Sequence, residues 1–261
     1  MKIAVSGKGG VGKTTFAGTL ARLLATEEAT VLAIDADPDA NLASALGFPD
    51  EMLKDVEPIA NMLDLIEERT GAKKGTFGGM FSLTPKVDDI PERFCKVHEN
   101  VRLLILGTVQ QAGSGCFCPE SALLKNLINY LFIRQQDTLI VDMEAGIEHL
   151  TRGSTSYVDM FIVTVEPGLR SIQTAFHIQG LAKGLGIKKV YVVGNKINSD
   201  DDKKLIESKV GDEMEVLGYI SYNPKIIEAD MKGIAPFDID EKLKDEVRAI
   251  NKRIKEIRNE K

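Results

Sequence analysis

The chain has 261 residues, of which 43% are hydrophobic and 28% are charged, and its formal net charge is -6. This length and composition predict one globular domain with a substantial core, and the acidic balance without a dense lysine and arginine block argues against a nucleic-acid surface. The apolar stretches are far shorter than the roughly 20 residues that span a bilayer, and the N-terminus lacks the signal-peptide pattern, so we expect a cytoplasmic protein without membrane attachment.

Short apolar segments typical of buried strands alternate along the chain with helix-like segments. The expected strands are residues 3–6, 30–34, 101–106, 138–141, 158–165, 189–193 and 216–220. The expected helices are residues 14–25, 59–69, 119–132, 171–185, 201–209 and 224–231. This alternation predicts an α/β fold, a doubly wound and mostly parallel sheet with helices on both faces, in which ligands gather at the carboxyl ends of the strands.

We expect a single domain that spans residues 1–261 and contains two segments of distinct character. Residues 48–100 are irregular and are expected to be a variable insertion that carries partner contacts. Residues 238–261 place apolar side chains three or four positions apart and predict a C-terminal amphipathic helix. Because its apolar face lacks aromatic residues, we expect this helix to pack on the sheet rather than on a membrane.

The segment GKGGVGKTT lies between the first expected strand and the first expected helix, and it matches the phosphate-loop pattern G-x-x-x-x-G-K-[ST]. Glycines let backbone N–H groups approach phosphate oxygens, and the helix N-terminus adds a favourable dipole. We expect Lys13 to neutralise phosphate charge and the hydroxyl of Thr14 to bind Mg²⁺. The expected nucleotide-binding residues of this loop are Gly7, Lys8, Gly9, Gly10, Val11, Gly12, Lys13, Thr14 and Thr15.

This loop resembles the deviant phosphate loop of the superfamily that contains MinD, ParA and the nitrogenase iron protein. The resemblance implies that Lys8 reaches across a dimer interface to the nucleotide of the partner subunit, in a role comparable to an arginine finger. Lys8, Lys13 and Asp37 are therefore the expected catalytic residues, and hydrolysis is expected to require a homodimer.

Three aspartates complete the expected site. The segment IDADPDANL resembles the first switch of the superfamily, which implies that Asp37 orients or activates the attacking water. Asp35 lies nearer the strand end, where it could hydrogen-bond a metal-bound water. Asp142 ends the apolar run TLIVD, in the Walker B position that holds Mg²⁺ directly or through water. The expected magnesium site therefore consists of Thr14, Asp35, Asp37 and Asp142.

The segment VVGNKIN bears on the choice of base. A guanine-specific site normally has Asn-Lys-x-Asp, because the aspartate accepts hydrogen bonds from both donors on the guanine edge. Here the fourth position is Asn198, so ATP is the expected nucleotide. The superfamily resemblance implies that Asn195, with Lys196 beside it, contacts adenine and that the loop around Pro224 flanks the base.

Two cysteines stand close together in GSGCFCPE. Cys116 and Cys118 are two positions apart in an extended segment, which would project both thiols to the same side. Pro119 is a favoured first helical residue, so the pair is expected at a helix N-terminus, where thiolates are stabilised. Soft-ligand zinc or nickel sites usually have four ligands, so a two-fold dimer would supply the second pair.

The cysteine pair, the deviant phosphate loop and the segment DMEAGIEHL together resemble the CooC family, the ATPases that insert nickel during maturation of carbon monoxide dehydrogenase. The similarity runs over nearly the whole chain. It implies ATP-controlled dimerisation, with Ni²⁺ or Zn²⁺ held between subunits by Cys116 and Cys118 of each chain. The client would be carbon monoxide dehydrogenase or the related acetyl-CoA synthase.

Two other functions use the same ATPase machinery. An iron–sulfur cluster carrier could hold a cluster on four thiolates from two chains, although related carriers typically have C-x-x-C near the C-terminus. A MinD/ParA-like positioning ATPase would act on DNA or membrane, but the sequence lacks the basic face or aromatic-rich helix for either, and the cysteine pair would have no role.

Overall fold

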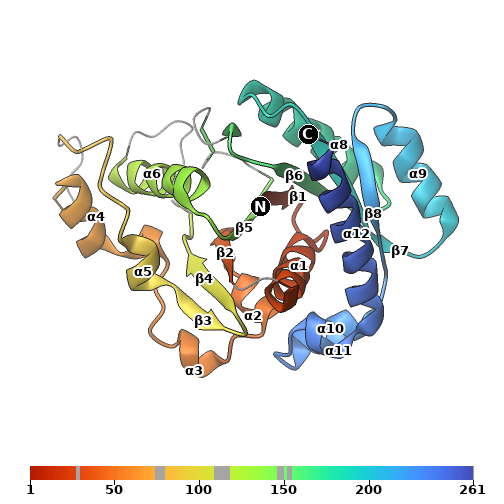
Figure 1. Ribbon diagram of the computed structural model, residues 1–261, viewed down its shortest axis with the longest axis horizontal. Helices are drawn as coiled ribbons and strands as arrows, with labels where there is room; N and C mark the ends of the chain where they lie inside the picture. Colours follow the sequence, from red (N-terminus) through yellow and green to blue (C-terminus); the bar gives the residue numbers. More distant parts are fainter. Residues whose placement is uncertain (28–29, 74–79, 109–117, 146–149, 152–154, 261) are drawn as a thin grey trace.

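The computed structural model describes residues 1–27, 30–73, 80–108, 118–145, 150–151 and 155–260 (Figure 1). Its strands form an eight-stranded sheet in the order β3-β4-β2-β5-β1-β6-β7-β8. Neighbouring strands are parallel except for β3 and β4, which are antiparallel. The strands are β1 Lys2–Gly7, β2 Val31–Ala36, β3 Lys96–His98, β4 Val101–Ile105, β5 Thr138–Met143, β6 Met160–Val165, β7 Val190–Ile197 and β8 Glu215–Ser221.

The helices of the described residues cover both faces of the sheet (Figure 1). They are α1 Lys13–Glu27, α2 Leu42–Leu46, α3 Asp50–Leu53, α4 Leu63–Thr70, α5 Ile90–Phe94, α6 Pro119–Arg134, α8 Leu169–Gly184, α9 Asp200–Val210, α10 Pro224–Met231, α11 Pro236–Ile239 and α12 Glu241–Asn259, with a 3-10 turn at Ile59–Asn61. The prediction of a doubly wound, mostly parallel sheet is confirmed.

Apart from the edge strand β3, alternate side chains of the strands enter one of two apolar cores. In β1, Ala4 packs on the side of α6, α8 and α9, whereas Ile3 and Val5 pack on the side of α1, α2 and α12. Because helices cover both faces, the central strands have no solvent face, and every residue of β2, β5 and β6 is buried. This double coverage explains the continuous apolar runs in the sequence.

The C-terminal helix begins later than residue 238. Asp240 has φ −130° and ψ 98°, which interrupts the helical path after α11, and its carboxylate accepts the N–H of Lys242 at 3.1 Å as an N-cap. From Glu241 onward the apolar stripe is buried against α1 and β8. Ile239 belongs to the separate short helix α11.

The segment from residue 48 to 100 contains α3, the 3-10 turn, α4, α5 and the edge strand β3. The helix expected at 59–69 is interrupted at Met62, whose ψ of 77° separates the 3-10 turn from α4. Helix α4 packs against α6 and contributes Leu65 and Ile66 to the core, so at least this part of the segment is integral to the domain. Its role in binding a partner stays a prediction.

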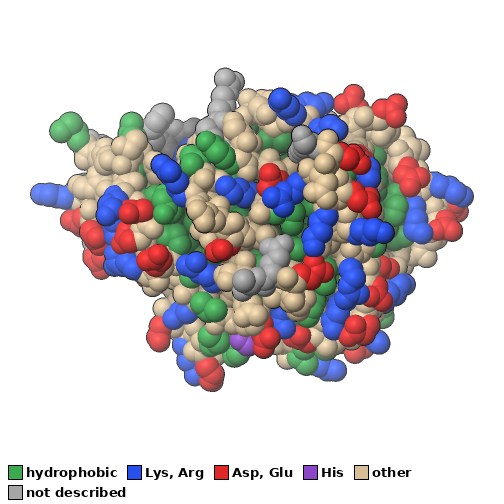
Figure 2. Space-filling model, in the orientation of Figure 1, with side chains coloured by type: hydrophobic (Ala, Val, Ile, Leu, Met, Phe, Trp, Pro, Cys, Tyr) green, Lys and Arg blue, Asp and Glu red, His purple; other side chains and the backbone are tan. Residues whose placement is uncertain are grey.

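On the face shown in Figure 2, basic and acidic side chains are intermixed, and no extended area of one sign covers it. Among the described residues, no helix combines the length and apolarity needed to cross a lipid bilayer.

Candidate nucleotide site

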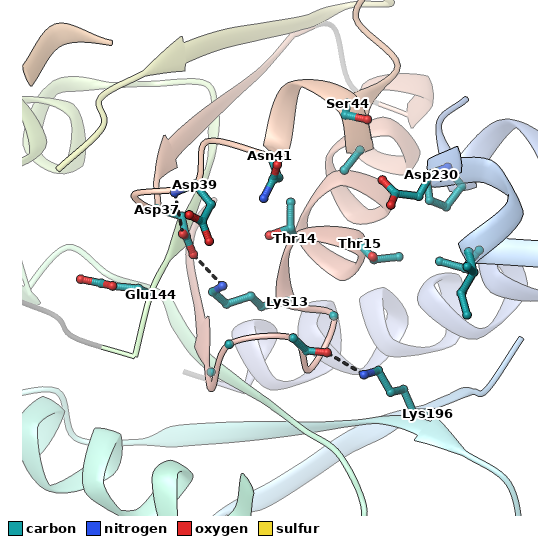
Figure 3. Close-up of a pocket in the computed structure, with 18 of the residues that line it drawn as sticks. Lys13, Thr14, Thr15, Asp37, Asp39, Asn41, Ser44, Glu144, Lys196 and Asp230 are labelled. Atoms are coloured by element: carbon teal, nitrogen blue, oxygen red, sulfur yellow. Dashed lines mark hydrogen bonds and ion pairs between the residues drawn. The ribbon is translucent and has the colours of Figure 1, made fainter. Parts of the chain in front are cut away.

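A cavity of about 720 Å³ lies at the carboxyl end of the sheet (Figure 3). Strand β1 leads into the phosphate loop, and the adjacent strands β5 and β2 place Asp142 and Asp35 directly opposite each other in register. The cavity is lined by five parts of the chain: the loop with the start of α1, the switch after β2 with α2, Glu144 and Ala145 after β5, Lys196 near the end of β7, and helix α10 with its connection to α11. The lining residues from the loop and the helix after it are Gly7, Gly9, Gly10, Gly12, Lys13, Thr14 and Thr15.

The phosphate loop depends on glycine at two positions. Gly10 and Gly12 have φ of 78° and 88°, in the left-handed region that residues with a Cβ rarely adopt. At Gly12 there is also no room, since a Cβ would lie 2.1 Å from the side-chain nitrogen of Asn195. Helix α1 starts at the next residue, Lys13, so its N-terminus points at the cavity and favours a bound anion.

Lys13 and Asp37 form a buried ion pair across the cavity, with 2.6 Å between Nζ and Oδ2 (Figure 3). Burial lowers the pKa of Lys13, but the hydrogen bond to Asp37 and the charges of Asp142 and Asp35 together raise it above its usual value. Lys13 therefore keeps its positive charge in the site. Without nucleotide, its charge is balanced by Asp37 rather than by phosphate.

Asp35 and Asp142 are both fully buried but differ in their partners. The carboxylate of Asp35 accepts the N–H of Leu42 at 2.8 Å and that of Asp37 at 3.2 Å, so it anchors the switch and the start of α2. Neither oxygen of Asp142 has a hydrogen-bond partner among the described residues. Burial raises the pKa of Asp35 to about 6 and that of Asp142 to about 7, although the neighbouring Thr14 hydroxyl acts to lower the latter.

The unpartnered Asp142 carboxylate fits a magnesium ion. Mg²⁺ is usually bound in proteins through one or two carboxylates together with substrate phosphates and waters, and an orphaned buried carboxylate beside a hydroxyl supplies such ligands. Asp142 and Thr14 are thus the protein groups that would hold it. Asp35 is already engaged with backbone N–H groups. Among the described residues, no group of three or more His, Cys, Asp or Glu side chains converges as a metal site.

Lys8, Asn195 and Pro224 are other residues expected at the nucleotide. Lys8 is half-buried, in a turn closed by a 3.4 Å bond from the Val11 N–H to its carbonyl, and its role across a dimer stays a prediction. Asn195 donates its amide to the Val11 carbonyl at 2.7 Å and accepts the Lys196 N–H, so both ends of its amide are engaged with protein. Its contact with adenine also stays a prediction. Pro224 is the first residue of α10, capped by Asn223.

The sequence reasoning missed most of the wall opposite the loop. After Pro224, helix α10 and the segment that follows it contribute Ile226, Ile227, Asp230, Ile234 and Pro236 to the cavity, and the switch and α2 contribute Asn41, Ser44 and Ala45. The sequence contains a signal for this wall, because it places a short helix with two adjacent isoleucines directly after the last strand. In a parallel sheet this helix starts at the ligand-binding edge.

Cys118 is the N-cap of α6, and Cys116 lies outside the described residues. The Cys118 sulfur accepts the N–H of Ser121 at 3.4 Å, and its thiol lies 3.1 Å from the Ser121 hydroxyl. Burial raises the pKa of the Cys118 thiol, and the bonds to Ser121 oppose that effect without cancelling it. Cys118 therefore lies at a helix N-terminus, as expected. The thiolate of Cys118 is not stabilised as expected, because burial in the single chain raises the pKa of the thiol.

Comparisons with known proteins place the chain in a family of nucleotide-binding proteins. The CobQ/CobB/MinD/ParA nucleotide binding domain matches residues 2–237. The chain is 48% identical over 250 residues to the carbon monoxide dehydrogenase accessory protein CooC of Rhodospirillum rubrum. The matched region covers 96% of this chain and 94% of that protein. The chain is also 40% identical over 261 residues to an uncharacterized ATP-binding protein of Methanocaldococcus jannaschii, covering 99% of each.

Solved structures agree on the fold. A chain of the MinC:MinD cell division protein complex of Aquifex aeolicus matches with a TM-score of 0.68 at 23% identity, covering 98% of this chain and 96% of that chain. A putative plasmid partition protein of Borrelia burgdorferi, bound to AMPPNP, matches with a TM-score of 0.69 at 17% identity, covering 98% and 99%.

Proposed function

Because the chain is an ATPase of the CobQ/CobB/MinD/ParA family, and within it belongs with the CooC proteins, we propose that it is a cytoplasmic accessory protein that supplies nickel to carbon monoxide dehydrogenase. The observation that carries the proposal is the close, nearly full-length similarity to a protein of that name. The related acetyl-CoA synthase is the second possible client.

The cavity supports ATP hydrolysis by groups with separate roles. Lys13 binds the terminal phosphates, which replace Asp37 as the partner of its ammonium. Asp37, released from that ion pair, accepts a hydrogen bond from the attacking water and orients it. Asp142 and Thr14 would hold Mg²⁺, which would supply charge stabilisation on the phosphate oxygens.

A homodimer completes both half-sites of the chain in this proposal. Lys8 serves the nucleotide of the partner subunit, which makes hydrolysis depend on association. Cys116 and Cys118 of each chain bind one nickel ion between the subunits, because two thiols alone do not satisfy a soft-ligand site. Burial raises the pKa of the Cys118 thiol in the single chain, which favours its protonated form, and metal binding would release that proton.

The proposal is tested by titrating Ni²⁺ into the reduced protein with ATP and without it. We expect thiolate-to-metal charge-transfer absorption that saturates at about one nickel per two chains. Cys118→Ser should abolish this absorption, whereas Cys95→Ser should leave it unchanged, because Cys95 lies in the segment between α5 and β3. Unchanged nickel binding by Cys118→Ser would contradict the metal assignment.

The same samples distinguish the iron–sulfur alternative. Protein purified without oxygen should carry no iron and no sulfide if nickel is its cargo. Stoichiometric iron and sulfide, with cluster absorption lost in Cys118→Ser, would instead establish a cluster carrier.

A further inference from the structure

The carboxyl end of β7 contains an irregularity of the strand with an unusual backbone. Lys196 has φ of 58°, in the left-handed region, and the pairing of β7 with β8 is irregular between Gly194 and Ile197. Both polar groups of the Lys196 backbone are held by neighbours: its N–H donates to the Asn195 side chain at 2.8 Å, and its carbonyl accepts the Asn198 amide at 3.2 Å. The surrounding hydrogen bonds thus maintain a conformation that a lysine would rarely adopt.

This irregular part of β7 brings two side chains onto the phosphate loop. The amide nitrogen of Asn195 donates to the Val11 carbonyl at 2.7 Å, and the ammonium of Lys196 donates to the Gly10 carbonyl at 2.6 Å (Figure 3). Asn195 is buried, and it lies against Gly12, where it leaves no space for a Cβ. Two consecutive residues of β7 therefore hold two consecutive carbonyls of the loop.

Fixing a carbonyl also fixes the N–H of the same peptide group, because the two point in opposite directions across a trans peptide bond, and no described peptide bond is cis. With its carbonyl bound by Asn195, the Val11–Gly12 peptide directs the Gly12 N–H away from β7, and Gly12 lines the cavity. In the Gly10–Val11 peptide, Lys196 holds the carbonyl and the Lys8 carbonyl accepts the N–H, so this peptide shapes the turn that carries Lys8.

The ammonium of Lys196 is itself held in place. Glu166, which follows β6, lies 3.3 Å from it, and β6 is hydrogen-bonded to both β1 and β7. The Lys196 side chain is 42% exposed, so it is accessible enough to be changed without opening the core.

We propose that Asn195 and Lys196 are positioning residues that act on the phosphates through the backbone of the phosphate loop. They preorganise the loop, so that the Gly12 N–H already faces the cavity before the anion binds and the turn that carries Lys8 keeps its shape. The inference rests on the proposed function, because it takes the cavity to be a nucleotide site, and it assigns to this pair a task other than reading adenine.

The test compares a nucleotide with a phosphate chain that has no base. Dissociation constants of ADP and of inorganic tripolyphosphate are measured by calorimetry for wild type and Lys196→Met, which keeps the apolar stem and loses the ammonium. A charged hydrogen bond that is partly exposed should be worth roughly tenfold in affinity, and we expect the loss to be equal for both ligands. Lys196→Arg should recover most of the affinity, because it restores a charged donor.

Two further variants separate the ammonium from other effects of the substitution. Lys196→Gly relieves the left-handed backbone and should bind both ligands as weakly as Lys196→Met, since it also lacks the ammonium. Lys189→Met changes an exposed lysine just before the other end of β7 and should bind like wild type. If Lys196→Met does not fold, Glu166→Gln provides the same comparison, with a smaller loss that is again equal for both ligands.

A loss confined to ADP would overturn the inference and make Lys196 a contact of the base. Wild-type affinity of Lys196→Met for both ligands would overturn it as well, and so would a wild-type chain that binds ADP but not tripolyphosphate. A wild-type chain that binds neither ligand would instead refute the nucleotide site itself.

Discussion

Replacing Asp142 by asparagine should stabilise the nucleotide-free and magnesium-free protein at pH 8. Burial raises the pKa of this carboxyl from 3.8 to about 7, and its oxygens lack partners among the described residues. A pKa that is higher in the folded state means that the folded chain binds the proton more tightly. The ionised carboxylate therefore lowers the free energy of unfolding as pH rises from about 4 to about 7.

The magnitude follows from the two pKa values. At about 1.4 kcal/mol per pH unit, the interval between 3.8 and about 7 corresponds to about 4 kcal/mol at full ionisation. The introduced amide is also buried, and its unmatched donors cost about 1–3 kcal/mol. We therefore expect Asp142→Asn to be more stable than wild type by about 1–3 kcal/mol at pH 8.

At pH 5 the wild-type carboxyl is protonated in the folded chain, so that advantage should disappear or reverse. The interval from pH 5 to about 7 corresponds to about 3 kcal/mol, and the variant should lose this amount relative to wild type. Urea unfolding in the presence of a chelator at both pH values measures the difference, with Asp201→Asn, an exposed carboxylate on α9, as the control. A difference between variant and wild type that does not change with pH would refute the reasoning.

Three other variants test the phosphate loop and the switch. Lys8→Ala should keep ADP binding but lose ATP-dependent dimerisation and hydrolysis; a monomeric variant that still hydrolyses ATP would exclude a role across the interface. Asp37→Asn should bind ATP and hydrolyse it roughly 10²- to 10⁴-fold more slowly, and normal turnover would show that it does not orient the water. Gly12→Ala should lose nucleotide binding and at least about 1 kcal/mol of stability, since its Cβ would lie 2.1 Å from Asn195; wild-type affinity would show that the loop can yield.

Seven of the observed strands overlap the segments expected from the sequence, because burial on both faces leaves continuous apolar runs in the central strands. The edge strand β3 could not be predicted in this way. It has three residues, with Val97 57% exposed, and it exists because Glu99 and Asn100 turn the chain back with left-handed backbones. A hairpin of this kind is determined by its turn and its neighbour β4 rather than by its own side chains.

For the site, local motifs identify residues but not their partners. The phosphate-loop pattern places a strand, a turn and a helix within nine positions, so the order of these elements can be predicted from the local sequence. The engagement of Asp35 with Leu42 and that of Lys196 with Gly10 depend on how distant parts of the chain meet. At Cys118, the proline that follows it indicates a helix N-terminus, but the degree of burial that raises its pKa depends on the packing of the whole domain.

The most direct test of the proposed function is the activation of a nickel-free client. Carbon monoxide dehydrogenase produced without nickel is mixed with this protein, a limiting amount of Ni²⁺ and ATP, and the oxidation of carbon monoxide is followed with time. We expect activity to appear with ATP and to be absent with a non-hydrolysable analogue or with Cys118→Ser. Activation at the same rate without ATP, or with the cysteine variant, would contradict ATP-driven delivery of nickel.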